Sequence, residues 1–309
     1  MKKLSLVISV YNEEAVLEKF YNAFCNIEQD LKYGGENELI FVNDGSTDAS
    51  MNILEVIAQQ NKNVRVISFS RNFGHEAAMI AGIDHAAGDV IICMDADLQH
   101  PLECIAPIMA KFEEGYEVIS MVRTSNKSAG AIKNFTSRAF YRVINALSDQ
   151  VKLEENASDF FAISSRVADV LRTNYREKTR FLRGYVQNVG FRKTTLEYTA
   201  AERAGGASHH TLKKLMNFAI STIVVFSDFP LKLGLYAGAV SFLAAVLFAI
   251  SALCGFREYK VILAAFNVLF AVLFLLVGIM GEYFSVAFAD LKNRPIYIVE
   301  KEINSGRCV

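Results

Sequence analysis

The sequence has little that would support a disulfide framework or a nucleic-acid-binding surface. Its 309 residues include five cysteines, an odd number, and no two of them form a Cys-x-x-Cys pair. We therefore interpret the cysteines as reduced thiols in a cytosolic setting rather than as disulfide partners or zinc ligands. The net charge is only −1, and no run of basic residues is present. No nucleic-acid partner is expected, because binding one would require a basic patch.

Charge is also missing from two long stretches near the C-terminus. Residues 233–256 and 261–281 contain no charged side chain, and the chain is 52% hydrophobic with a mean hydropathy of +0.24. At about 1.5 Å per helical residue, each stretch exceeds the ~30 Å hydrocarbon core of a bilayer. They predict a transmembrane hairpin over residues 233–285. The alternative, a pair of core helices in a soluble protein, is disfavoured by two uncharged runs of this length.

Basic residues outside this hairpin predict its orientation. Lys232 precedes the hairpin, and Lys292 and Arg294 follow it. The positive-inside rule then places both termini in the cytosol of an inner or plasma membrane protein with two spans. The expected parts are a cytosolic domain over residues 1–210, helices along the membrane interface over 211–232, the hairpin over 233–285 with helices at 233–256 and 261–281, and a cytosolic tail over 286–309.

The first half of the chain alternates between strand-like and helix-like segments. Strands are expected at residues 4–10, 38–42, 64–68, 90–94, 117–121 and 159–164. Helices are expected at residues 13–30, 48–61, 75–86, 134–147 and 177–187. The first apolar run ends without a cleavage site, so we interpret it as a buried strand rather than a signal peptide. Because the strands are apolar on both faces and separated by helices, we predict an α/β fold with a mostly parallel sheet covered on both sides. Functional residues then belong at the carboxyl ends of the strands.

An acidic pair follows the expected strand at residues 90–94. Asp95 and Asp97 stand two residues apart, and Gln99 adds an amide oxygen. This set suits Mg2+ or Mn2+, since these cations take oxygen ligands and keep positions open for phosphate oxygens. A solvated turn is the alternative for a pattern this short.

Two further polar clusters follow the first and second strands. After the second strand, Gly45 permits a tight turn, Asp48 suits the start of a helix, and Asp44 could accept hydrogen bonds from a nucleobase or ribose. Taken alone, that cluster is better explained as a plain strand-to-helix turn. After the first strand, Asn12 is either a helix cap or a nucleotide contact.

Taken in order, these clusters resemble the family 2 glycosyltransferases of the GT-A fold. The segments that carry the resemblance are Tyr11-Asn12-Glu13, Asp44-Gly45, Ser70-Arg71-Asn72-Phe73-Gly74-His75-Glu76, the Asp95 to Pro101 segment, Arg203-Ala204-Gly205-Gly206-Ala207-Ser208, Gly281-Glu282-Tyr283 and Asn293-Arg294-Pro295-Ile296-Tyr297. They span nearly the whole chain. Within the family, the set is most similar to polyisoprenyl-phosphate glycosyltransferases such as bactoprenol glucosyltransferases and dolichol-phosphate mannose synthases.

The resemblance implies inverting transfer of a sugar from a nucleotide sugar to a polyisoprenyl phosphate in the bilayer. It implies donor contacts from Tyr11, Asn12, Glu13, Asp44, Arg71, Asp95 and Ser208. It implies that the acceptor phosphate is held by Arg123, Lys127, Lys133 and Ser137. It implies catalytic roles for Asp97, Asp159 and Arg203. It also implies that Mg2+ or Mn2+ is bound by Asp95, Asp97 and Gln99. For Asp159 a structural role is an equal alternative.

The residues leave several alternatives open. UDP-glucose is the first expected donor, with UDP-GlcNAc, UDP-galactose and GDP-mannose as alternatives, and the resemblance is compatible with a homo-oligomer. A processive polysaccharide synthase is disfavoured, because its Gln-x-x-Arg-Trp motif needs a tryptophan and the sequence has none. A non-catalytic lipid-phosphate-binding protein is the alternative from another class, and the intact Asp95, Asp97 and Gln99 set argues against it. His209 and His210 stand where the family usually has Lys-Tyr.

Overall fold

The computed structural model describes residues 2–28, 37–124, 154, 157–178, 180–201, 229–253 and 259–305. These residues belong to two compact units. The first unit comprises the described residues up to Ala201 together with those from Pro295 onward, and the second comprises those from Phe229 to Arg294. The C-terminal segment therefore belongs to the same unit as the N-terminal half of the chain.

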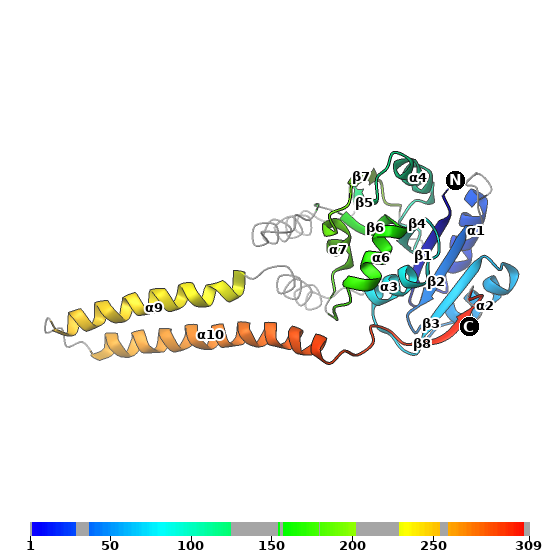
Figure 1. Cartoon of the computed structure of the whole chain (residues 1–309). Helices are drawn as coiled ribbons and strands as arrows, with labels where there is room; N and C mark the ends of the chain where they lie inside the picture. The colour runs from blue at the N-terminus through cyan, green and yellow to red at the C-terminus, as the bar shows by residue number, and fades with distance from the viewer. Residues whose placement is uncertain are drawn as a thin grey trace. The chain divides into compact units, whose positions relative to one another are not determined.

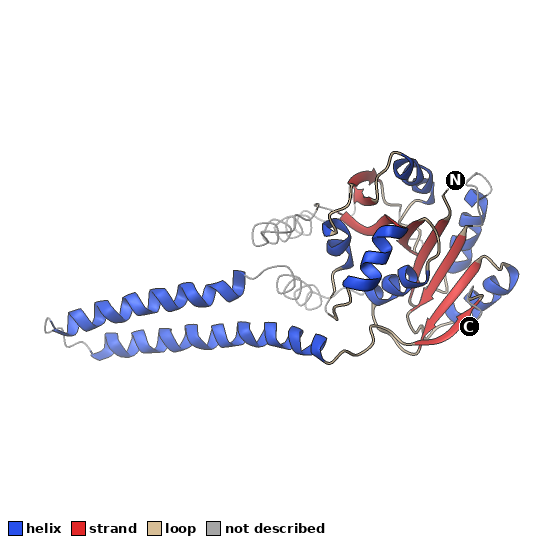
Figure 2. Ribbon diagram, viewed as in Figure 1, coloured by secondary structure: helices blue, strands red, loops and turns tan. Residues whose placement is uncertain are grey.

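A sheet of eight strands forms the centre of the first unit, counted over the described residues (Figure 1, Figure 2). The strands are β1 (Leu4–Val10), β2 (Glu38–Asn43), β3 (Val64–Phe69), β4 (Val90–Asp95), β5 (Val118–Arg123), β6 (Ala157–Ser164), β7 (Lys193–Tyr198) and β8 (Val299–Ile303). Their order in space is β7-β5-β6-β4-β1-β2-β3-β8. All neighbours run parallel except that β6 is antiparallel to β4 and β5, and β8 is antiparallel to β3. The predicted mostly parallel sheet is confirmed.

Helices cover both faces of this sheet, as predicted. They are α1 (Leu17–Glu28), α2 (Ser50–Gln60), α3 (His75–His85), the short 3-10 helix η1 (Leu102–Cys104), α4 (Ile105–Glu113), α6 (Ser165–Asn174) and α7 (Leu182–Asn188). Side chains along a strand alternate between the two faces. Leu6 and Ile8 of β1 accordingly share a core with Phe20 of α1. Val7 lies on the opposite face, where α3 approaches so closely that Gly82 has no room for a side chain.

The sequence missed two strands, the helices α4 and α6, and the direction of a third strand. β7 and β8 were not expected, and the predicted strand at residues 159–164 is β6, which runs antiparallel between β4 and β5. β8 escapes local pattern reading because three of its five residues are charged and exposed. Its partner in the sheet is also remote in sequence, with Val66 opposite Ile303. The helix predicted over residues 134–147 lies outside the described residues.

The second unit contains two long apolar helices where the sequence predicted the hairpin. They are α9 (Phe229–Leu253) and α10 (Tyr259–Leu291), and they pack against each other. Within α10, the span Val268–Leu291 is long and apolar enough to cross a membrane, with a mean hydropathy of 2.1 and none of it buried. It is the single such span among the described residues. Apolar side chains such as Phe274, which is 71% exposed, need a hydrophobic environment.

Candidate active site

The sheet order brings three of the predicted clusters to one edge. β4, β1 and β2 are neighbours, and they run in the same direction. Their carboxyl ends are in register, with Ser9 opposite Asp95 and Val10 opposite Asn43. The residues that follow these strands therefore gather at the edge where parallel α/β sheets bind ligands.

Asp44 is buried at this edge, where it holds the loop after β3. Its side chain accepts hydrogen bonds from the backbone N–H groups of Phe73, at 2.6 Å, and Gly74, at 3.0 Å. Burial raises the pKa of the Asp44 carboxyl, while these hydrogen bonds favour its charged form. We call residues 70–74 the donor loop, because Arg71 was predicted to contact the sugar donor. Asp44 therefore fixes the shape of that loop.

The donor loop also lies directly against the turn after β2. Gly45 has a φ of +66°, and a Cβ there would lie 2.5 Å from the carbonyl carbon of Arg71 and 2.7 Å from the backbone nitrogen of Asn72. Only glycine combines this left-handed conformation with such a close approach. The predicted need for a glycine in this turn thus has a second cause, the packing of the loop.

Asn12 links the end of β1 to the turn after β2 rather than capping α1, which begins at Leu17. Its side-chain oxygen accepts a hydrogen bond from the backbone N–H of Thr47 at 2.8 Å, and its own N–H donates to the Ser46 hydroxyl at 3.0 Å. Asn12 adopts a left-handed φ of 55° to do so. The neighbouring Tyr11 is 45% exposed, and its ring is accessible at this edge of the sheet.

Asp95 lies beside two residues that sequence reasoning did not select. Its Oδ1 is 3.3 Å from the Ser9 hydroxyl, which donates to it, and 3.6 Å from Nε2 of His75. Desolvation lowers the pKa of His75, whereas nearby carboxylates, Asp95 foremost, raise it. The carboxylates together outweigh desolvation, so the pKa lies above its ordinary value. His75 opens α3 inside the motif that carried the family resemblance, and that position was the only sequence signal for it.

The chain turns sharply after β4, and this turn is supported by His100. Oδ1 of the buried Asp97 accepts the backbone N–H of Gln99 at 3.0 Å, and Leu98 has a left-handed φ of 60°. Nδ1 of His100 accepts the Asp95 N–H at 3.1 Å, and burial lowers the pKa of His100. A neutral imidazole is what this hydrogen bond requires. A φ above zero at a residue such as leucine stores strain, which is often found at functional sites.

The oxygen atoms of this turn fit a hard divalent cation. Asp95 and Asp97 offer carboxylates, and Gln99 offers an amide oxygen. Among the described residues, no three His, Cys, Asp or Glu side chains gather into a metal site by themselves. Two carboxylates and one amide would leave several coordination positions for the phosphate oxygens of a substrate.

Arg123 and Asp159 come to the same region from the antiparallel part of the sheet. Nη2 of Arg123, at the end of β5, lies 3.5 Å from Oε1 of Gln99. Asp159 on β6 is 41% exposed, and its Oδ1 is 3.8 Å from Nε of Arg183 on α7. Arg183 also donates to the carbonyl of Ala157 at 2.7 Å, which ties α7 to β6. Arg123 thus lies beside the acidic turn, and Asp159 lies near enough to His100 of that turn to act on the pKa of its imidazole. Sequence reasoning did not select Arg183.

Several predicted site residues cannot be placed. They lie outside the described residues and are Lys127, Lys133, Ser137, Arg203 and Ser208. Glu13, by contrast, is described, and its backbone N–H donates to the Ser50 hydroxyl at 2.9 Å. The described part of the candidate site therefore contains the three predicted metal ligands, every predicted donor residue except Ser208, and one predicted acceptor residue, Arg123.

Comparisons with known proteins show the family of the chain. Residues 5–172 match the model of glycosyl transferase family 2, and the chain belongs to this family. It is a glycosyltransferase.

Its relatives match along nearly their full length. The chain is 38% identical to the uncharacterized glycosyltransferase YkcC of Bacillus subtilis, with 96% of this chain and 93% of the relative covered. It is 36% identical to the SfII prophage-derived bactoprenol glucosyl transferase of Shigella flexneri, with 97% of this chain and 98% of the relative covered. Among solved structures, a glucosyl-3-phosphoglycerate synthase of Mycobacterium tuberculosis is similar, with a TM-score of 0.49 and 18% sequence identity. The match covers 72% of this chain and 76% of the synthase chain.

Proposed function

We propose that this glycosyltransferase moves glucose from UDP-glucose to a polyisoprenyl phosphate at the cytosolic face of a membrane. The observation that carries the proposal is that the donor loop, held by Asp44, and the acidic turn of Asp95 and Asp97 both follow parallel strands and lie at the same edge of the sheet. The relatives named bactoprenol glucosyl transferase support the acceptor. The apolar span Val268–Leu291 supports a bilayer location. A second crossing by α9, which packs against α10, is part of the proposal.

The chemistry of the acceptor defines what the protein must supply. A phosphate monoester has a second pKa near ~6, so it is largely dianionic at neutral pH and needs little help from a base. The difficult tasks are to neutralise the departing diphosphate and to hold two anions together. A divalent cation such as Mg2+ or Mn2+, held by Asp95, Asp97 and Gln99, would supply a Lewis acid for the diphosphate.

Protein side chains would carry out the remaining tasks. Arg123 is the described residue best placed to bind the acceptor phosphate, since it lies 3.5 Å from Gln99 and thus close to the acidic turn. Lys127, Lys133 and Ser137 would complete that site, and Arg203 and Ser208 would add contacts to the diphosphate. Asp159, paired with Arg183, would orient the acceptor or the sugar. Displacement in a single step then inverts the anomeric carbon.

Membrane vesicles of defined orientation test the reaction and its side of the membrane together. Inside-out vesicles that contain undecaprenyl phosphate should form a solvent-extractable glycolipid from labelled UDP-glucose, and right-side-out vesicles should not, because the site faces the cytosol. UDP-GlcNAc, UDP-galactose and GDP-mannose are tested in parallel as the alternative donors. No glycolipid from any of the four donors would contradict the proposed function. Equal product in both vesicle types would contradict the orientation alone.

Arg123→Ala should weaken use of the lipid acceptor far more than binding of the nucleotide sugar. A charge-assisted hydrogen bond contributes roughly 1.5–3 kcal/mol, so acceptor efficiency should fall by about 10- to 100-fold. The measurement is kcat/KM for a short, water-soluble prenyl phosphate, which removes any effect of membrane association. Arg166→Ala is the matched control, because that arginine is 74% exposed on α6 and pairs with Glu117. Wild-type efficiency of the Arg123 variant with this acceptor would remove Arg123 from the acceptor site.

A further inference from the structure

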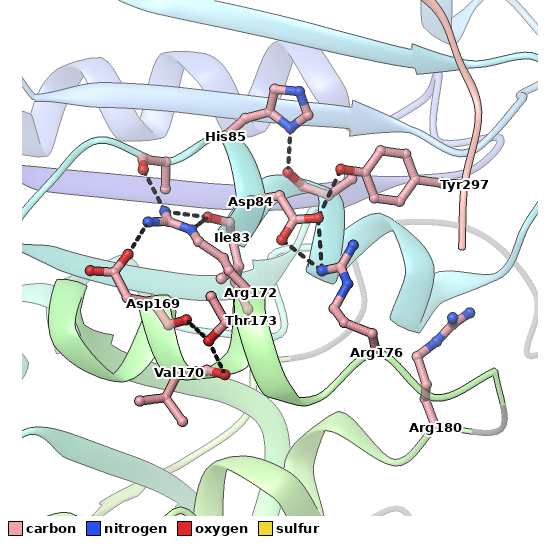
Figure 3. Close-up of polar contacts among 12 residues, drawn as sticks. Ile83, Asp84, His85, Asp169, Val170, Arg172, Thr173, Arg176, Arg180 and Tyr297 are labelled. Carbon is pink, nitrogen blue, oxygen red and sulfur yellow. Dashed lines mark hydrogen bonds and ion pairs between the residues drawn. The ribbon is translucent and has the colours of Figure 1, made fainter. Parts of the chain in front are cut away.

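The segment that follows α10 belongs, from Pro295 onward, to the first unit, and Tyr297 attaches it there. The Tyr297 hydroxyl donates to Oδ2 of Asp84, near the end of α3, at 2.8 Å. Arg176 donates to both oxygens of the same carboxylate, at 2.9 and 3.0 Å (Figure 3). The carboxylate thus keeps one partner, Arg176, even when the tyrosine hydroxyl is removed.

The ring of Tyr297 makes a separate contact, with the base of the donor loop. It stacks on Phe69, the last residue of β3, with ring centroids 5.1 Å apart and an interplanar angle of 14°. Phe69 in turn meets Phe73 of the donor loop edge to face at 5.7 Å. The guanidinium of Arg71 lies 3.9 Å from the centre of the Phe73 ring. Three aromatic rings therefore lead from Tyr297 to Arg71.

The backbone of the same segment also holds the donor loop. The N–H of Ser70, the first residue of the loop, donates to the carbonyl of Ile298 at 3.1 Å. From the other side the loop is held by Asp44, through Phe73 and Gly74. The donor loop is thus confined between the turn after β2 and the segment after α10.

We propose that Tyr297 is a positioning residue for the donor, acting through Phe69 and Phe73 on the nucleotide-binding conformation of the donor loop. This inference rests on the proposed function, in which that loop contacts the nucleotide sugar. Tyr297 is half-buried, and the rest of the segment has its own attachments, such as the 2.7 Å ion pair of Lys301 with Glu55 on α2. Loss of the Tyr297 ring should therefore disturb the loop without releasing the segment.

The test compares three full-length variants in detergent or nanodiscs. Tyr297→Leu removes the stacked ring, Tyr297→Phe keeps it, and Lys301→Ala breaks the ion pair that joins the same segment to Glu55 of α2. Binding of UDP, the diphosphate product of the preferred donor, is measured by calorimetry, together with KM for donor and for acceptor. Tyr297→Leu should bind UDP roughly 3- to 10-fold more weakly, the range expected for loss of one aromatic contact. Its donor KM should rise in parallel while its acceptor KM stays unchanged.

The two controls decide whether the effect belongs to the ring. Tyr297→Phe should restore UDP affinity to within about twofold of wild type, since an aromatic ring keeps the stacking. Lys301→Ala should bind UDP as the wild type does. Wild-type affinity in Tyr297→Leu, or an equal loss in Tyr297→Phe, would overturn the inference.

A double-mutant cycle keeps the inference testable even if Tyr297→Leu is less stable. Phe73→Leu removes the ring at the other end of the contact with Phe69. If both residues act through one path, the losses of UDP affinity in the two single variants should not add in the double variant. Additive losses would overturn the inference. Absence of any nucleotide binding by the wild-type protein would instead refute the proposed function itself.

Discussion

Asp97→Asn is expected to lower sugar transfer by at least about 100-fold, while the protein still folds and inserts into the membrane. Asparagine keeps the shape of the side chain, so its oxygen can still accept the Gln99 N–H that Asp97 accepts at 3.0 Å. The substitution therefore removes the negative charge and leaves the turn after β4 in place. Loss of activity then reports on the charge that a divalent cation and the diphosphate require.

The measurement is the initial rate of glycolipid formation across a titration of Mn2+ or Mg2+. Glu103→Gln is the matched control, because this exposed acidic residue lies on η1, shortly after the same turn. It should transfer sugar at the wild-type rate. An Asp97→Asn protein within fivefold of wild type would contradict the role of Asp97, as would undiminished wild-type transfer in the presence of a chelator.

Gly45→Ala should abolish nucleotide binding and destabilise the first unit. The residue has a φ of +66°, which costs an L-amino acid about 1–2 kcal/mol. The added Cβ would in addition lie 2.5 Å from the Arg71 carbonyl carbon, a backbone atom that no change of rotamer can move. The donor loop must shift to admit it, and the hydrogen bonds from that loop to Asp44 should be lost with it.

Gly190→Ala separates the cost of backbone strain from the cost of the Cβ clash. Gly190 has a φ of +81°, and a Cβ there would meet no heavy atom within 4 Å. It should therefore lose only the ~1–2 kcal/mol of backbone strain and keep wild-type affinity for UDP. Melting temperature and UDP binding are measured for both variants. Equal UDP affinity of the two would show that the close approach at Gly45 does not govern the donor loop.

Most of the sheet could be predicted because its strands carry a strong local pattern. β1 to β4 are short, apolar on both faces and separated by helices, and each of the four was predicted. The direction of β6 was not readable, because a buried strand has the same apolar pattern whether it runs parallel or antiparallel to its neighbours. β7 and β8 lie at the two edges of the sheet, where exposed side chains weaken the pattern.

The residues of the candidate site also divide into those that the sequence could predict and those that it could not. Asp44, Asp95 and Asp97 could be selected from the sequence, because polar residues directly after buried strands of a parallel sheet share one edge. Ser9, His75 and Arg183 could not, since their contacts join residues that are far apart in the chain. Nothing local distinguishes such residues from ordinary members of a strand or helix.

The sequence by itself determined the class of fold, the family, the acidic turn and the two apolar helices, because hydrophobic periodicity, short motifs and the absence of charge are local properties of a chain. Only the tertiary structure decided that Asp44 holds the donor loop, that Arg123 lies beside Gln99, and that Tyr297 reaches Phe69. These contacts depend on strand order and register. They are set by the packing of the whole core, so a local sequence pattern cannot predict them.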